Sequence, residues 1–192
     1  MIIYATKKTV DRYGIKMPEE FQNKIMRPIV LDVYNKEKGN KMVEWGAKIF
    51  YFDRRKCIQF CHFASKLTIV LVDIKKGDLE TIGQMLAMYL LDIYSDDKEM
   101  TALLKRWFKD YTIMCFAKIT DRSIIAKMNN FQNTYLMDGY TLYHYIEGNT
   151  LKTIKLNRDI NKYHYVSYTI DGKTKHMNPK ERFAELLKDY YK

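Results

Sequence analysis

The sequence has no hydrophobic run long enough to cross a membrane. A spanning helix needs roughly 18–20 consecutive apolar residues, whereas the longest apolar stretch, residues 85–94, is interrupted by Asp92 and flanked by charges. Residues 1–8 place a short apolar stretch before their positive charges, and that stretch is far too short for the core of a signal peptide. We therefore expect a cytoplasmic protein with no membrane segment.

Cysteine is scarce, with three residues in a chain of 192. An odd number in a chain of this size argues against a disulfide framework and fits a reducing compartment. Cys57 and Cys61 are followed by His62, which raises the question of a metal site. On a strand, however, the two cysteines share one face while His62 points to the other, and no second Cys/His pair stands at ligand spacing. We interpret the thiols as core residues and expect no metal or cofactor.

Familiar catalytic motifs are also missing. The sequence contains no GxGxxG, P-loop, GxSxG or HExxH pattern and no pair of carboxylates at a recognisable spacing. A toxin-like ribonuclease that works without metal stays open as an alternative. His144, His164, Tyr165 and Arg158 supply the residue types that move protons and hold a phosphorane in such enzymes.

The sequence is rich in positive charge and in aromatic residues. Lys and Arg number 33 against 23 Asp and Glu, so the formal net charge is +10. This imbalance attracts polyanions, of which nucleic acid is the commonest. The alternative is a solvated lysine surface in the Lys-, Ile-, Asn- and Tyr-rich composition of an AT-rich genome. With 47% hydrophobic and 14% aromatic residues, the chain has enough apolar surface to fold.

The first two thirds predict a sheet with helices packed on it. Residues 1–5 read as a strand and residues 17–40 as irregular. Aromatic and β-branched runs at 43–52, 57–63 and 67–72 are separated by short polar segments, which favours an antiparallel meander.

Helical patterns follow this meander. Apolar residues at helical spacing after Asp78, and again after Asp96, predict a helical hairpin that covers the sheet. A strand at 111–119 then leads to a third helix, which we expect Thr120 to cap. Strands in a run followed by helices in a run indicate an α+β fold.

The last part reads as a small β-meander closed by a helix. Strands are predicted at 139–146, 151–156 and 163–170, the last followed by the turn Asp171-Gly172. Asn178 then begins the final helix. We predict two units: an α+β core over 1–136 and a β-meander plus helix module over 137–192.

Several short motifs, taken in their order, carry a resemblance to a known family. The motifs are Thr6-Lys7-Lys8, Trp45, Arg54-Arg55-Lys56, residues 67–72, residues 118–123 and Met128-Asn129-Asn130. On these motifs, the chain resembles an uncharacterised bacterial domain family that is found alone or ahead of plasmid-borne ORF-three-like proteins. The resemblance covers about residues 1–135 and implies a bacterial, plasmid or phage setting, but no activity.

Two basic motifs are candidate anion ligands. Arg54, Arg55 and Lys56 lie where two predicted strands turn, which projects three cations that can clamp phosphate. The alternative is a solvated tip, partly neutralised by Asp53. Arg122 lies in the first turn of a predicted helix, where the dipole disfavours a cation. Its position therefore indicates either an internal ion pair or an external anion.

The C-terminal module adds aromatic residues interleaved with cations. Tyr143, Tyr145 and Tyr165, with Arg158, suit a stacking platform for single-stranded nucleic acid. Strand alternation puts Tyr143 and Tyr145 on one face of the predicted strand and Tyr140 and His144 on the other. One set is therefore expected to fill a core, and an interface for a protein partner is an equal alternative. We expect a non-catalytic binding protein for nucleic acid or a nucleoprotein complex. The alternatives are a protein-binding inhibitor or accessory factor that docks on a host protein through this module, and the ribonuclease.

Overall fold

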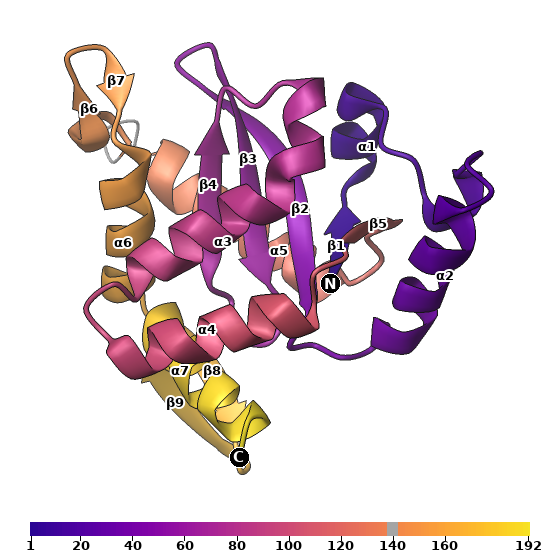
Figure 1. Ribbon diagram of the computed structural model, residues 1–192. Helices are drawn as coiled ribbons and strands as arrows, with labels where there is room; N and C mark the ends of the chain where they lie inside the picture. Colours follow the sequence, from indigo (N-terminus) through magenta and orange to yellow (C-terminus); the bar gives the residue numbers. More distant parts are fainter. Residues whose placement is uncertain (138–141) are drawn as a thin grey trace.

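A five-stranded mixed sheet forms the centre of the computed structural model, which describes residues 1–137 and 142–192 (Figure 1). The strand order is β4-β3-β2-β1-β5. The strands are β1 (Ile2–Ala5), β2 (Glu44–Phe52), β3 (Arg55–His62), β4 (Thr68–Val72) and β5 (Cys115–Lys118). The α+β fold class is confirmed.

The predicted meander is present, but it makes up only part of the sheet. β2, β3 and β4 pair antiparallel, with Phe50 opposite Cys57 and Cys57 opposite Val72. β1 instead pairs parallel with β2 on one side and with β5 on the other. Parallel partners are joined through long crossover connections, so local spacing predicted each strand but not this arrangement.

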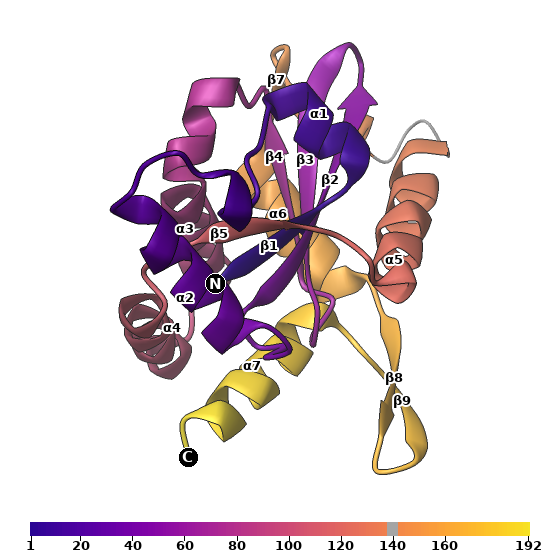
Figure 2. The ribbon, with the colours of Figure 1, turned by 90° about the vertical axis from the view of Figure 1, so that its right-hand side faces the viewer.

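Helices cover both faces of the sheet, as the edge-on view in Figure 2 shows. One face carries Trp45, Ile58 and Leu71 against α3, α4 and α7. The other face packs on α5, with α2 over the β1 and β5 side. The helices are α1 (Lys7–Tyr13), α2 (Met26–Glu37), α3 (Ile82–Ile93), α4 (Lys98–Asp110), α5 (Arg122–Gln132), α6 (Thr153–Tyr163) and α7 (Pro179–Tyr190), with short turns η1 (Pro18–Glu20), η2 (Lys76–Thr81), η3 (Asn133–Met137) and η4 (Tyr143–Tyr145).

Close packing of α5 on the sheet depends on a glycine. A Cβ atom built on Gly46 would lie 2.6 Å from Cγ2 of Ile124 and 3.2 Å from Cε of Met128. Both side chains are buried on the face of α5 that packs on the sheet. The absence of a side chain at Gly46 therefore sets how closely this helix approaches β2.

Several helix boundaries differ from those expected. Residues 17–40, read as irregular, contain α2. The helical hairpin is present, but α4 is capped by Asp97, whose carboxylate accepts from the Met100 amide, and not by Asp96. The third helix is capped by Asp121 and not by Thr120. In both cases the sequence offers two adjacent capping residues, and spacing alone does not choose between them.

The C-terminal prediction of a three-stranded meander is wrong. Residues 151–156, expected as a strand, contain the short β7 (Thr150–Leu151) and the start of α6, while β6 (Ile146–Glu147) is equally short. Part of the expected strand 139–146 lies outside the described residues, and the rest holds the turn η4. The hairpin of β8 (Val166–Ile170) and β9 (Lys173–Met177) and the Asn178 cap are present as expected.

The C-terminal segment packs on the first part of the chain. Phe183 and Leu187 of α7 lie in the core beside Trp45 and Trp107, while Leu156 of α6 packs in a second cluster. The division into units at residues 136 and 137 stays a prediction. Within the described ranges, no helix combines the length and apolar character that crossing a bilayer requires.

Candidate nucleic-acid interface

The turn between β2 and β3 places an arginine in a backbone conformation that favours glycine. Phe52 pairs with Arg55, so Asp53 and Arg54 form a two-residue hairpin turn, with φ angles of 46° and 63°. Turns of this kind prefer Asn-Gly or Asp-Gly, because positive φ crowds a side chain. Arg54 is exposed and occupies the position where such turns favour glycine. Its backbone conformation therefore costs free energy relative to that of a glycine.

An exposed tyrosine lies beside this turn, between two lysines. Tyr51 is 49% exposed, and Lys56 is its direct partner across the ladder. The Lys8 ammonium of α1 lies 5.5 Å from the centre of the Tyr51 ring, within cation–π distance. Arg12, one helical turn after Lys8, is also exposed. We call the set Lys8, Arg12, Tyr51, Arg54 and Lys56 the tip face.

The cations of the tip face are not neutralised internally. In the described part of the chain, none of its four cations forms an ion pair with a carboxylate. Elsewhere, ion pairs tie the helices together, such as Lys188 of α7 with Glu99 of α4 at 2.5 Å. The tip face therefore combines one exposed aromatic ring with four cations that have no ion-pair partner in the described part of the chain.

Arg55, the middle residue of the predicted basic triplet, has a different position. It is half-buried, its guanidinium donates to the main-chain carbonyl of Asn149, and it lies 3.9 Å from the Asp73 carboxylate. Arg55 thus holds the loop between β6 and β7 against the β2–β3 turn, at the same end of the molecule (Figure 1). Of the triplet, Arg54 is exposed, and Lys56 is half-buried as the cross-strand partner of Tyr51.

The predicted tyrosine platform is not formed as a strand face. Tyr143 lies edge-on against Phe52, with ring centres 4.8 Å apart, and remains 47% exposed near the tip face. Tyr145 instead donates a hydrogen bond to Asp159, 3.2 Å away. Burial and this carboxylate raise the pKa of Tyr145 well above its usual range. η4 is a turn, so strand alternation does not order these two rings.

Arg158 is occupied inside the protein. Its guanidinium donates to both carboxylate oxygens of Asp92, at 2.7 and 2.6 Å, and so links α6 to α3. A guanidinium held by such a two-pronged bond has few donors left for phosphate. No local pattern predicts this pair, because its residues are 66 positions apart.

Two further predicted site residues lie apart from the tip face. Arg122 is exposed at the start of α5 and forms no ion pair within the described ranges, so the internal partner considered for it is not observed. Tyr165, 62% exposed, precedes β8 at the opposite end of α6.

The histidines considered for catalysis do not converge. His144 lies in η4. The main-chain carbonyl of the next residue, Tyr145, accepts a hydrogen bond from the Lys152 amide at the start of α6. His164 follows the last residue of that helix. Eleven helical residues rise about 16 Å, so the two imidazoles cannot act on one phosphate.

The cysteines and His62 have structural positions. All three thiols are buried and free, and burial raises the pKa of Cys57 to about 12 and that of Cys115 to about 11. Both ring nitrogens of His62 are hydrogen-bonded, to Ser65 and to the carbonyl of Met42. Among the described residues, no group of three or more His, Cys, Asp or Glu side chains is placed to hold a metal ion.

The fold and its tip face define an α+β domain with a mixed sheet and a basic, aromatic hairpin end. Residues 2–182 match the family described as Domain of unknown function (DUF6933), and the chain belongs to that family. The expected membership of an uncharacterised domain family is thereby confirmed. The match extends past residue 135 and includes α6 and the β8–β9 hairpin. A search of the curated proteins finds no match to this chain.

Proposed function

We propose that this protein is a non-catalytic binding protein for single-stranded nucleic acid, which it engages through the tip face. The setting we propose is the cytoplasm of a bacterium, on the chromosome or a mobile element. The observation that carries the proposal is the exposed Tyr51 ring between Lys8 and Lys56. Proteins that bind single strands without sequence preference stack bases on aromatic rings and track the backbone with cations.

The conformation of Arg54 supports the same function. Glycine would relieve the positive φ at this position, so hairpin stability alone does not account for an arginine. A guanidinium at a protruding turn can make a two-pronged contact with phosphate. The tip face thus combines one stacking surface with several phosphate ligands.

A specific observation favours protein binding as the second candidate. Tyr163 and Tyr165 are 64% and 62% exposed at the junction of α6 and β8, beside a hairpin that extends from the body (Figure 2). Exposed tyrosines are enriched at protein interfaces. This surface lies at the opposite end of α6 from the tip face, so the two candidates are separable by substitution.

The test measures fluorescence anisotropy of labelled single-stranded DNA and RNA with the full chain. Tyr51→Ala is expected to weaken binding roughly 5- to 150-fold, because stacking of one base contributes about 1–3 kcal/mol. Tyr51→Phe keeps the ring and should retain affinity. Tyr165→Ala is the matched control and should have no effect. Loss of binding in Tyr165→Ala with full binding in Tyr51→Ala would overturn the proposal.

A further inference from the structure

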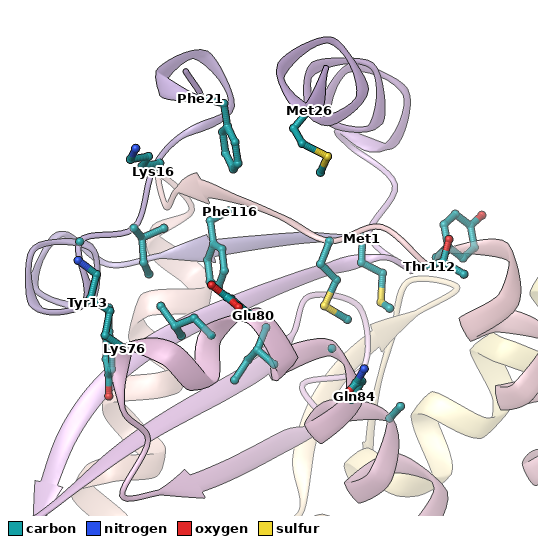
Figure 3. A pocket seen from close by; sticks show the side chains of 18 of the residues that line it. Met1, Tyr13, Lys16, Phe21, Met26, Lys76, Glu80, Gln84, Thr112 and Phe116 are labelled. Atoms are coloured by element: carbon teal, nitrogen blue, oxygen red, sulfur yellow. The ribbon is translucent and has the colours of Figure 1, made fainter. Parts of the chain in front are cut away.

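A cavity whose lining contains none of the tip-face residues begins at the end of α1, directly after Arg12. It has a volume of about 800 Å³ and lies between the end of α1, η1 and the start of α2 on one side and η2, α3 and the end of α4 on the other (Figure 3). This volume is within the range of sites that hold small organic ligands. Its walls are mainly apolar, and they include Met1, Phe21, Leu79, Ile82, Met114 and Phe116.

The charged groups of the cavity are unevenly distributed. Lys16 and Lys76 both lie at the α1 end, as Figure 3 shows. The Lys76 ammonium is 3.0 Å from where a Cβ atom on Gly14 would be, and Lys16 follows Gly14 by two residues. Met1, Met26 and Thr112 line the opposite end (Figure 3). The cavity therefore has its two lysines at one end and mainly apolar, uncharged side chains at the other.

Glu80 provides the one carboxylate among the residues that line the cavity. Neither it nor the two lysines takes part in an ion pair within the described ranges. The α-ammonium of Met1 is paired with Glu37, so the two lysine ammonium groups and the Glu80 carboxylate leave a net charge of +1. That balance suits an occupant with a single negative charge.

The apolar walls continue into exposed apolar surface at the start of α2. Ile25 is 75% exposed and Met26 is 41% exposed. Accessible apolar surface of this kind costs free energy unless a ligand covers it. Met1, Met26 and Met114 have flexible thioether side chains, which adapt to ligands of different shape.

From these features we infer that the cavity binds an amphipathic carboxylate, a hydrocarbon body with one terminal carboxylate group. The hydrocarbon covers Phe21, Phe116 and the methionines, and the carboxylate lies between Lys16 and Lys76. Charge complementarity sets the orientation. This site is independent of nucleic-acid binding, since its residues are not those of the tip face.

Isothermal titration of the full chain with decanoate, decanol and decylammonium, each below its micellar concentration, tests the inference. Decanoate should bind most tightly of the three. Lys76→Met should weaken decanoate two- to fivefold, the size of a partly exposed charge contact. Glu80→Gln should tighten decanoate by a similar factor, because it removes a like charge. Neither change should alter decanol binding.

Ala87→Leu places a larger side chain in the wall of the cavity and should abolish binding of decanoate and decanol together. Thermal unfolding of each variant confirms that it folds. If decylammonium binds as tightly as decanoate, or if Lys76→Met and Glu80→Gln change decanoate affinity in the same direction, the assignment is wrong. Absence of heat with all three probes on the folded wild-type chain at both 15 °C and 35 °C also overturns it, because apolar burial changes the heat capacity and cannot be silent at both temperatures.

Discussion

The side chain of Asn157 pairs with the main chain of Val70 as a neighbouring strand would. Its amide oxygen accepts from the Val70 N–H at 2.7 Å, and its amide nitrogen donates to the Val70 carbonyl at 2.9 Å. Asn161 repeats this pattern on Thr68, at 2.8 and 2.6 Å. Four helical residues rise about 6.0 Å and two strand residues about 6.6–6.8 Å, so the two spacings match. Helix α6 thus closes the free edge of β4.

Asn157→Ala should destabilise the protein, because the Val70 N–H and carbonyl lose their partners in a buried setting. Each group left without a hydrogen bond costs about 1–3 kcal/mol. Urea unfolding measures the change in free energy of unfolding. Lys155→Ala, at an exposed position of the same helix, is the control and should change it by less than about 0.5 kcal/mol. Equal stability of the two variants would contradict this account of α6.

Gly46→Ala should destabilise the contact between α5 and β2. The added methyl group overlaps Ile124 and requires a shift of the helix, and overpacking of this kind costs about 1–3 kcal/mol. Gly77→Ala is the matched control, because no atom lies within 4 Å of a Cβ built there. Comparable free energies of unfolding for both variants would show that α5 does not rest on Gly46.

Because of His62, the free energy of unfolding should decrease as pH falls through a defined window. Burial lowers the pKa of His62 to about 3, whereas an unfolded histidine titrates near 6.5. The unfolded state therefore binds a proton that the folded state does not, and stability is lost as pH falls from about 6.5 towards 3. The slope approaches about 1.4 kcal/mol per pH unit.

Urea unfolding at pH 7 and pH 5.5 checks this slope against His62→Gln, which lacks the titrating group. We expect the wild type to lose about 1 kcal/mol more than the variant over this interval. Identical losses in the two proteins would mean that His62 is not buried in its neutral form.

Arg54→Gly should separate stability from binding. Glycine relieves the positive φ, so the free energy of unfolding should stay level or rise by up to about 1 kcal/mol. Arg54→Ala keeps the strained backbone and should be less stable than Arg54→Gly. Both variants remove the guanidinium and should lose nucleic-acid affinity equally. Urea unfolding measures the stability of each variant, and fluorescence anisotropy measures its affinity. Full affinity in either one would exclude Arg54 from the interface.

Local patterns in the sequence predicted the elements whose partners are close in sequence. Four of these elements depend on residues that are neighbours along the chain: the β2–β4 meander, the α3–α4 hairpin, the β8–β9 turn and the Asn178 cap. α6 was missed because the polar residues Thr153 and Lys155 alternate with the apolar Ile154 and Leu156 as in a strand. Its helical spacing appears only when Asn157 and Asn161 are counted with the inward stripe.

Long-range pairing explains the remaining differences at the site. The sequence identified Arg54 and Lys56 as turn cations, but it gave no indication that Arg55 contacts Asn149, 94 residues away. The sequence predicts Tyr51 only as part of a strand. Its exposure depends on the end of the sheet being left uncovered beside α1, and Lys8 reaches it across the parallel β1–β2 pairing. Pairing of this kind has no local signal.

The most direct test of the tip face is the salt dependence of single-strand binding in two variants of equal charge. Lys8→Gln/Arg54→Gln/Lys56→Gln removes three cations from the tip face, and Lys98→Gln/Lys105→Gln/Lys109→Gln removes three from α4. Each phosphate contact contributes about 0.7 to the slope of log K against log salt. We predict that the tip-face variant lowers the magnitude of the slope by about 2, while the α4 variant leaves it unchanged. Equal slopes in both variants would contradict the proposed function.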